Sequence, residues 1–337
     1  MADLTTKYLG LELKSPIVVG ACNLVTNVDA LKRMEAAGVG AIVYKSLFEE
    51  QIQLETLEME QGMEDYNERN AEMTSLFPGL KHAGPKEHLH NFKKAVEAVN
   101  IPVIASLNAI YDVTWVDYAI ELEKAGAAAL ELNFYTVPRD FDKEAGSIED
   151  AQVAVLKEIK DSVKIPVSVK LSPYYSNPLN VVKKMDEVGV DGFVLFNRLF
   201  QPEIDLETEK HHFPWNLSST GDNRLPLRFA GLLHNRIKGD IISNTGILTS
   251  KDALQMILAG ANSVQVVSAL YKNKIEYVAE MLKEMEVWMD EKGYKSLCDF
   301  RGKLSDDTMN DRFAYKRAQY VDILYNSKDI FDTYPMR

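Results

Sequence analysis

Polar side chains follow the short apolar runs of this 337-residue chain at the points where the runs end. In chain order these residues are Ala21-Cys22, Lys45-Ser46, Asn108, Asn133, Lys170, Asn197, Asn244-Thr245-Gly246 and Ser268. A single lysine at such a point would more often be structural. Burying an uncompensated lysine or asparagine costs several kcal/mol. If the ends of these runs meet at one place, two lysines and several amides there predict a polar, anionic ligand between them.

Two of these turns suit a phosphate group. Thr245-Gly246 and Ser268-Ala269 follow the last two apolar runs. Barrel enzymes commonly bind phosphate at these two places, through backbone N–H groups and the N-terminus of a helix. Barrel enzymes for phosphorylated sugars share this spacing, and a tight turn without a ligand is the alternative interpretation.

The elements that must position these residues follow a regular alternation. Eight apolar runs predict strands at Ser15–Ala21, Gly40–Lys45, Ile101–Leu107, Ala127–Asn133, Ile165–Leu171, Val190–Phe196, Asp240–Ser243 and Ser263–Val267. Amphipathic stretches between and after them predict helices near 28–37, 86–99, 114–125, 148–162, 178–188, 227–237, 250–259 and 274–291. This alternation is typical of parallel strands joined by crossover helices. Eight units favour the α/β class and a closed (β/α)8 TIM barrel over an open doubly wound sheet.

Two connections are much longer than the usual few residues, at 46–85 after the second strand and at 198–226 after the sixth. Both leave from the carboxyl ends of strands, where barrel enzymes place their sites, so we expect them to act as lids. We assign residues 1–303 to the barrel domain. Residues 304–337 form a polar C-terminal extension with scattered aromatic residues, and we expect it to cover a surface or to contact another subunit.

Composition excludes several classes of partner. A net charge of −12 without clustered lysine and arginine argues against nucleic acid. Cys22 and Cys298 are too few for a disulfide framework or a zinc site, and no histidine spacing predicts a metal. No apolar run approaches eighteen residues, and the first residues lack the features of a signal peptide. We therefore expect a cytoplasmic enzyme that acts on a small molecule, with no membrane association.

Several stretches, taken together and in order, resemble the FMN-dependent dihydroorotate dehydrogenases, especially the soluble class. They are the opening Leu9–Ile17, Tyr44-Lys45-Ser46, Glu131-Leu132-Asn133, Val169–Tyr174, Asn197 and Asn244–Ile247. The resemblance extends to about Leu304 and leaves out only the C-terminal tail. It implies a homodimer that binds FMN and oxidises dihydroorotate to orotate in pyrimidine biosynthesis, or acts on a related dihydropyrimidine.

The resemblance also implies a set of FMN contacts. They are Ala21, Cys22, Lys45, Ser46, Asn133, Lys170, Asn197, Thr245, Gly246, Ser268 and Ala269. Lys170 occupies the position of the family's lysine, whose ammonium would stabilise the reduced flavin near N1 and O2. The phosphate would lie on the N–H groups of Gly246, Ser268 and Ala269. The family has paired glycines where this chain has Thr245-Gly246, and it has a glycine before Ser268 where this chain has Val267.

The substrate would lie between the flavin and a catalytic base. By resemblance, Asn133 and Asn197 would bind the ring amides and the carboxylate, while Lys45 and Asn70 would complete the substrate site. Soluble members use a cysteine base in Leu-Asn-x-Ser-Cys-Pro-Asn, and the membrane-associated class uses serine. This chain reads Leu-Asn-Phe-Tyr-Thr-Val-Pro at 132–138, which puts Thr136 at the base position.

The altered loop leaves alternatives open. Thr136 could follow the serine precedent, Tyr135 is a second candidate for the base, and a third interpretation is that neither acts. The chain could then be a flavin-binding subunit without catalytic activity. A lyase or aldolase that uses Lys170 as a Schiff base beside a phosphate site is an alternative from another enzyme class. The sequence does not specify the electron acceptor.

Overall fold

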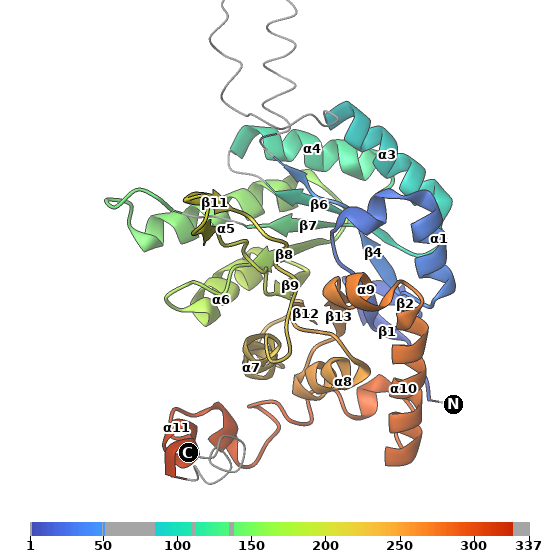
Figure 1. The fold of residues 1–337 in the computed structure, drawn as a ribbon, viewed down its shortest axis with the longest axis vertical. Coiled ribbons are helices and arrows are strands. Elements are labelled where there is room, and N and C mark those ends of the chain that lie inside the picture. The colour runs from blue at the N-terminus through green and yellow to red at the C-terminus, as the bar shows by residue number, and fades with distance from the viewer. Residues whose placement is uncertain (1, 49, 51–84, 109–111, 135–137, 326–337) are drawn as a thin grey trace, which may run out of the picture.

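A closed barrel of eight parallel strands forms the centre of the molecule (Figure 1). The computed structural model describes residues 2–48, 50, 85–108, 112–134 and 138–325. The barrel strands are β3 (Ile17–Val19), β4 (Ala41–Val43), β6 (Val103–Asn108), β7 (Ala129–Asn133), β8 (Val167–Leu171), β9 (Gly192–Leu195), β12 (Asp240–Ser243) and β13 (Ser263–Val266). Their order is β4-β3-β13-β12-β9-β8-β7-β6, and pairing of β4 with β6 closes the ring. The predicted (β/α)8 barrel is confirmed.

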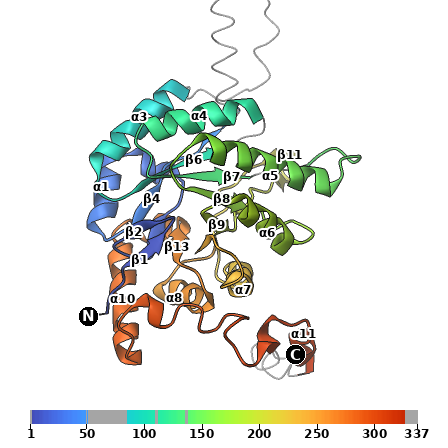
Figure 2. The ribbon, with the colours of Figure 1, turned by 180° about the vertical axis from the view of Figure 1, so that it is seen from behind.

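Helices surround the barrel, as the views from both sides show (Figures 1 and 2). They are α1 (Val28–Ala36), α3 (Pro85–Ala98), α4 (Asp112–Lys124), α5 (Ala145–Ser162), α6 (Pro178–Val188), α7 (Arg224–Leu233), α8 (Ser250–Ala259) and α10 (Tyr277–Lys292). Short polar residues start several of them. Asn27, Asn177 and Thr249 each accept a hydrogen bond from a backbone N–H of the first turn. Gly189 ends α6 in the left-handed conformation, which lets the chain turn into the next strand.

A hairpin that the sequence analysis did not predict covers the amino-terminal end of the barrel. It consists of β1 (Thr6–Tyr8) and β2 (Leu11–Leu13). Tyr8, Leu9 and Leu13 are buried in one cluster with inward-facing residues of six barrel strands. The approach is close, because a Cβ at Gly192 would lie 2.6 Å from Leu9 Cδ2. A ligand site is therefore expected at the opposite, carboxyl-terminal end.

Four features of the connections differ from the sequence-based expectation. The eighth helix was predicted at 274–291, but α9 (Ser268–Asn273) comes first, and Lys274 at φ +80° separates it from α10. Helix α7 begins three residues earlier than the predicted 227. The long connection after β9 carries its own hairpin, β10 (Glu203–Asp205) with β11 (Lys210–His212). Strand β5 (Leu47–Phe48) extends the sheet beside β6 before the first long connection.

The last described residues lie outside the ring of helices, beyond α7 (Figures 1 and 2). They include the short helix α11 (Gln319–Tyr325), none of whose residues is buried. Tyr315 anchors this part of the chain, because a Cβ at Gly231 of α7 would lie 2.0 Å from its hydroxyl. Within the described ranges, no helix has both the length and the apolar character needed to span a membrane.

Candidate functional site

A cavity of about 310 Å³ opens at the carboxyl-terminal ends of the barrel strands. Nine of the predicted cofactor contacts line it, namely Ala21, Cys22, Lys45, Ser46, Lys170, Asn197, Thr245, Gly246 and Ser268. Asn133 and Ala269 do not line it: Ala269 is buried beneath, and Asn133 reaches the cavity only through its contact with Asn197. Parallel strands thus bring together residues that are up to 247 positions apart in the chain.

Lys170 at the end of β8 presents a buried ammonium group to this cavity. The residue is 7% exposed. Its Nζ lies 3.5 Å from Gln265 Oε1 and 3.7 Å from Glu131 Oε1, which are both long contacts. An ammonium group has three N–H donors. Within the described part of the chain, Gln265 and Glu131 are the acceptors that Lys170 Nζ contacts. Lys170 therefore retains an N–H donor for a ligand in the cavity.

Two side-chain amides meet between neighbouring strands. Asn197 Nδ2 donates to Asn133 Oδ1 at 2.8 Å, after β9 and β7 respectively. Asn197 lines the cavity, so the pair offers amide donors and acceptors at its floor. On the other side Ser46 and Ser106 share a hydroxyl hydrogen bond of 2.7 Å. This bond fixes the Ser46 side chain against β6.

The turn after β12 has an unusual backbone. Thr245 adopts φ +74° and Gly246 adopts φ +77°. A β-branched residue rarely takes this conformation, but Thr245 Oγ1 donates to Phe196 O at 2.9 Å and thereby holds it. Gly246 has no room for a side chain, because a Cβ there would lie 2.3 Å from the backbone N of Asn223. Glycine at this position therefore lets the connection at Asp222 and Asn223 pack directly against the turn, and both Thr245 and Gly246 line the cavity.

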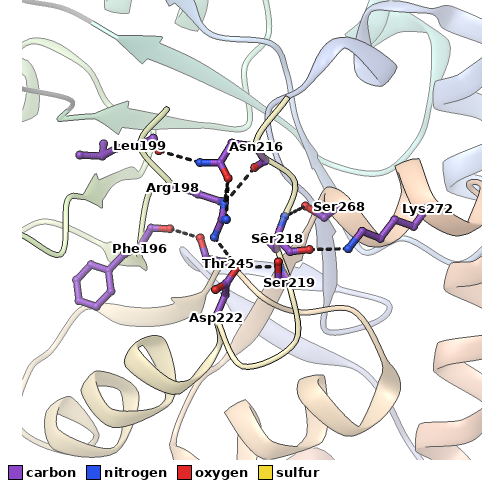
Figure 3. A network of polar contacts seen from close by, with 10 residues as sticks. All are labelled: Phe196, Arg198, Leu199, Asn216, Ser218, Ser219, Asp222, Thr245, Ser268 and Lys272. Atoms are coloured by element: carbon purple, nitrogen blue, oxygen red, sulfur yellow. Dashed lines mark hydrogen bonds and ion pairs between the residues drawn. The ribbon is translucent and has the colours of Figure 1, made fainter. Parts of the chain in front are cut away.

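A polar network fixes the long connection after β9 over the same end of the cavity (Figure 3). Arg198 is at its centre: Nε donates to Asn216 O and Oδ1 at 3.0 Å, and Nη1 donates to Asp222 Oδ2. Ser218 N donates to Ser268 Oγ at 2.8 Å, and Lys272 Nζ donates to Ser218 O at 2.6 Å. Arg198 therefore joins the start of the connection to its last part, and α9 holds that same last part at Ser218.

We expect Arg198→Lys to loosen this connection. A lysine cannot reproduce the planar fork that binds Asn216 and Asp222 together. Charge-assisted hydrogen bonds contribute about 1.5 kcal/mol or more each, so local opening should become about tenfold more frequent. Limited digestion with chymotrypsin, mapped by mass spectrometry, should show faster cleavage at the exposed Phe200 and Trp215.

The matched control for that digestion is Arg33→Lys. Arg33 pairs with Glu276 at 2.7 Å on the outside of the barrel, far from this connection in the chain. Its variant should be cleaved at the wild-type rate. Equal cleavage of the wild type and of Arg198→Lys would show that the guanidinium does not hold the connection.

Aromatic side chains line the mouth of the cavity. The Trp215 ring lies 6.5 Å from the Phe200 ring and 6.1 Å from the Tyr271 ring, measured between centroids. Cys22 lies on the same wall. Burial raises the pKa of the Cys22 thiol, so it is protonated at neutral pH and is not a thiolate nucleophile.

His88 of α3 provides a pH-sensitive contact behind Lys45. Its ring packs edge-on against Tyr44 at a centroid distance of 5.5 Å. Burial, with a smaller contribution from the Lys45 charge, lowers the pKa of His88 to about 4. An unfolded histidine has a pKa of about 6.5, so between these values the unfolded chain binds a proton that the folded protein does not. The stability that neutral His88 contributes is complete above pH 6.5 and is lost as the pH falls toward 4.

We expect His88 to lower the free energy of unfolding by about 2 kcal/mol at pH 5 relative to pH 7.5. Urea unfolding at both pH values measures the difference. His88→Phe keeps an aromatic ring against Tyr44 and should lose this part of the pH dependence. His90→Phe, an exposed position on the same helix, is the control and should keep it. An unchanged pH dependence in His88→Phe would contradict the assignment.

Three predicted residues lie outside the described ranges, namely the base candidates Tyr135 and Thr136 and the substrate candidate Asn70. The sequence analysis missed further lining residues, among them Arg198, Trp215, Gln265 and Tyr271. Gln265 had a visible signal, because it is a polar residue within an apolar run. Across the described part of the chain, no group of three or more histidine, cysteine or acidic side chains is arranged to hold a metal ion.

Comparisons with known proteins agree over most of the chain. The family model described as dihydroorotate dehydrogenase matches residues 3–289. A dihydroorotate dehydrogenase B (NAD(+)) catalytic subunit of Thermoplasma volcanium is 28% identical over 309 residues, which cover 90% of this chain and 98% of that protein. The protein of the same name from Methanocaldococcus jannaschii is 26% identical, covering 86% and 96%. A dihydroorotate dehydrogenase A (fumarate) of Lactobacillus helveticus is 25% identical, covering 90% and 99%.

Proposed function

Because the chain belongs to the dihydroorotate dehydrogenase family, we propose that it binds FMN and oxidises dihydroorotate or a closely related dihydropyrimidine. Its family makes it an oxidoreductase that acts on CH–CH groups. The observation that carries the finer proposal is the buried Lys170 ammonium, which faces the cavity with unused donors. A flavin that accepts a hydride gains negative charge, and this position suits that charge.

The residues of the cavity fit FMN at both ends. At one end Lys170 can donate to the N1 and O2 edge of an isoalloxazine ring. At the other end Thr245, Gly246 and Ser268 line the cavity, and the first N–H groups of α9 at Ser268 and Ala269 have no acceptor within their own helix. Backbone N–H groups of this kind suit a phosphate. When bound, FMN would supply the hydride acceptor.

The remaining proposed roles belong to substrate binding and proton transfer. Asn133 and Asn197 would exchange their mutual hydrogen bond for bonds to the substrate's ring amide and carboxylate. Lys45 would attract the carboxylate from the neighbouring wall. Thr136 or Tyr135 would take the proton from C5 as the hydride leaves C6. Asn70 remains a proposed substrate contact.

An absorbance spectrum of the purified protein tests the proposal. We expect bound flavin, or tight binding of added FMN, and anaerobic bleaching on titration with dihydroorotate. Dihydrouracil, which lacks the carboxylate, is the comparison that tests the substrate. A colourless protein that does not bind FMN would overturn the proposal. If FMN binds but neither Thr136→Ala nor Tyr135→Phe slows bleaching, both base assignments are wrong.

The finer points of organisation stay predictions. The division into a barrel domain at 1–303 and an extension at 304–337 is one, and the homodimer and the cytoplasmic location are others. The relatives are named for two acceptors, NAD(+) and fumarate. We propose no acceptor for this chain.

A further inference from the structure

A buried carboxylate lies inside the barrel next to Lys170. Glu131 of β7 is 1% exposed, and its Oε1 lies 3.7 Å from Lys170 Nζ of β8. Gln265 connects the two from β13: its Nε2 donates to Glu131 Oε2, and its Oε1 accepts from Lys170 Nζ at 3.5 Å. Strands β7 and β13 lie on opposite sides of the ring, so their side chains meet in the barrel interior.

Other groups around Glu131 do little to balance the negative charge of its carboxylate. Ser168, on the adjacent strand, donates its hydroxyl to Leu130 O. Burial, together with the Glu131 charge, raises the pKa of Tyr8, so this phenol is neutral at physiological pH. Glu131 Oε1 makes no hydrogen bond within the described structure. The Lys170 ammonium is therefore the positive charge that balances the buried carboxylate, and the carboxylate in turn balances Lys170.

We propose that Glu131 is a positioning residue that fixes Lys170 and lowers the reduction potential of the flavin, an inference that rests on the proposed FMN site. Two electrons and one proton convert oxidised FMN to its reduced anion, whose charge lies near N1. The Lys170 ammonium stabilises that anion. The Glu131 carboxylate behind it opposes the same charge, and the low dielectric of the barrel interior keeps this repulsion from being screened.

Removing the Glu131 charge should raise the reduction potential of bound FMN. Glu131→Gln keeps the shape and the contact with Gln265 but removes the charge, so the reduced anion should bind more tightly relative to oxidised FMN. We expect the ratio of the two dissociation constants to change about tenfold, which for a two-electron couple raises the midpoint potential by about 30 mV. Anaerobic titration with dithionite against a reference dye of known potential measures it. Fluorescence quenching gives the dissociation constant for oxidised FMN.

The matched control is Glu144→Gln, which removes one exposed carboxylate before α5 and should leave the potential unchanged. A wild-type protein that binds no FMN would overturn the proposed function itself. A folded Glu131→Gln variant that binds FMN at the wild-type potential would overturn only the role of Glu131.

If Glu131→Gln fails to fold, Glu131→Asp replaces it. Aspartate keeps the charge but withdraws it from Nζ by one methylene, so a smaller upward shift is expected. An unchanged or lowered potential in that variant would overturn the inference. A merely structural role would alter thermal stability without moving the potential, so thermal unfolding of the same variants separates the two roles.

Discussion

Lys170→Met is expected to slow the anaerobic bleaching of bound FMN by dihydroorotate about 100- to 1000-fold. Loss of one fixed donor to a developing negative charge has an effect of this size in other enzymes. Lys170 is buried and lines the cavity, and methionine fills the same space without a charge or an N–H donor. Stopped-flow absorbance of the flavin band measures the rate directly. Lys251→Met, an exposed position on α8, is the control.

The variant also leaves Glu131 without its counter-charge. Removing one partner of a buried ion pair destabilises proteins by about 3–5 kcal/mol, so a slow reaction could reflect a damaged fold. The double variant Lys170→Met with Glu131→Gln restores a neutral interior. Stability should then return toward the wild type while bleaching stays slow. Recovery of the bleaching rate in the double variant would contradict a direct role for Lys170.

Lys170→Arg distinguishes the flavin enzyme from the Schiff-base alternative. Arginine keeps the positive charge, so an enzyme that needs only this charge should keep part of its activity. A Schiff base requires a primary amine, which arginine lacks. A lyase or aldolase would therefore lose all activity in Lys170→Arg, and its wild type would be trapped by borohydride in the presence of a carbonyl substrate.

The barrel itself could be predicted from sequence because its signals are local. The barrel strands are buried on both faces, so most of them appear as largely apolar runs, and the observed strands fall within or one residue beyond the predicted ranges. Asn27, Asn177 and Thr249 mark helix starts that also agree with the periodicity. Once the strands are parallel, their carboxyl ends must meet, which is why nine predicted residues line one cavity.

The parts that sequence did not predict depend on contacts between distant segments. The hairpin of β1 and β2 has strands of only three residues, and its stability comes from packing against the barrel end. Glu131 and Gln265 interrupt apolar runs, which is a usable signal for a polar interior. Their pairing across 134 residues appears only when the ring closes. The role of Arg198 likewise depends on how the long connection returns to Asp222.

Gly246→Ala is expected to weaken the binding of FMN about 100-fold. The new Cβ would lie 2.3 Å from Asn223 N and 2.7 Å from Asp222 C, and neither backbone atom can rotate away as a flexible side chain would. Either the turn or the facing connection must therefore move. Losing one or two charge-assisted hydrogen bonds to a phosphate, at about 1.5–3 kcal/mol each, accounts for an effect of this size.

A comparison with riboflavin shows whether Gly246→Ala weakens FMN binding through lost contacts to the phosphate. It has the same ring system without the phosphate, so Gly246→Ala should weaken riboflavin binding much less than FMN binding in the same fluorescence titration. Gly146→Ala is the control, because a Cβ at that position meets nothing within 4 Å. Equal losses for both ligands would indicate general damage to the cavity. Unchanged FMN binding would place the phosphate elsewhere.

Thr245→Gly tests whether this turn needs glycine because of its positive φ or because of the close approach of the facing backbone. Thr245 already carries a Cβ at φ +74°, held by its bond to Phe196 O, so positive φ alone is tolerated here at a cost of about 1–3 kcal/mol. Glycine removes that strain together with the hydrogen bond, and FMN affinity should change far less than in Gly246→Ala. Both residues have positive φ, but it is at Gly246 that an added Cβ would lie 2.3 Å from a backbone atom, the N of Asn223. A large loss in Gly246→Ala with little change in Thr245→Gly would therefore assign the requirement for glycine to the close approach of Asn223.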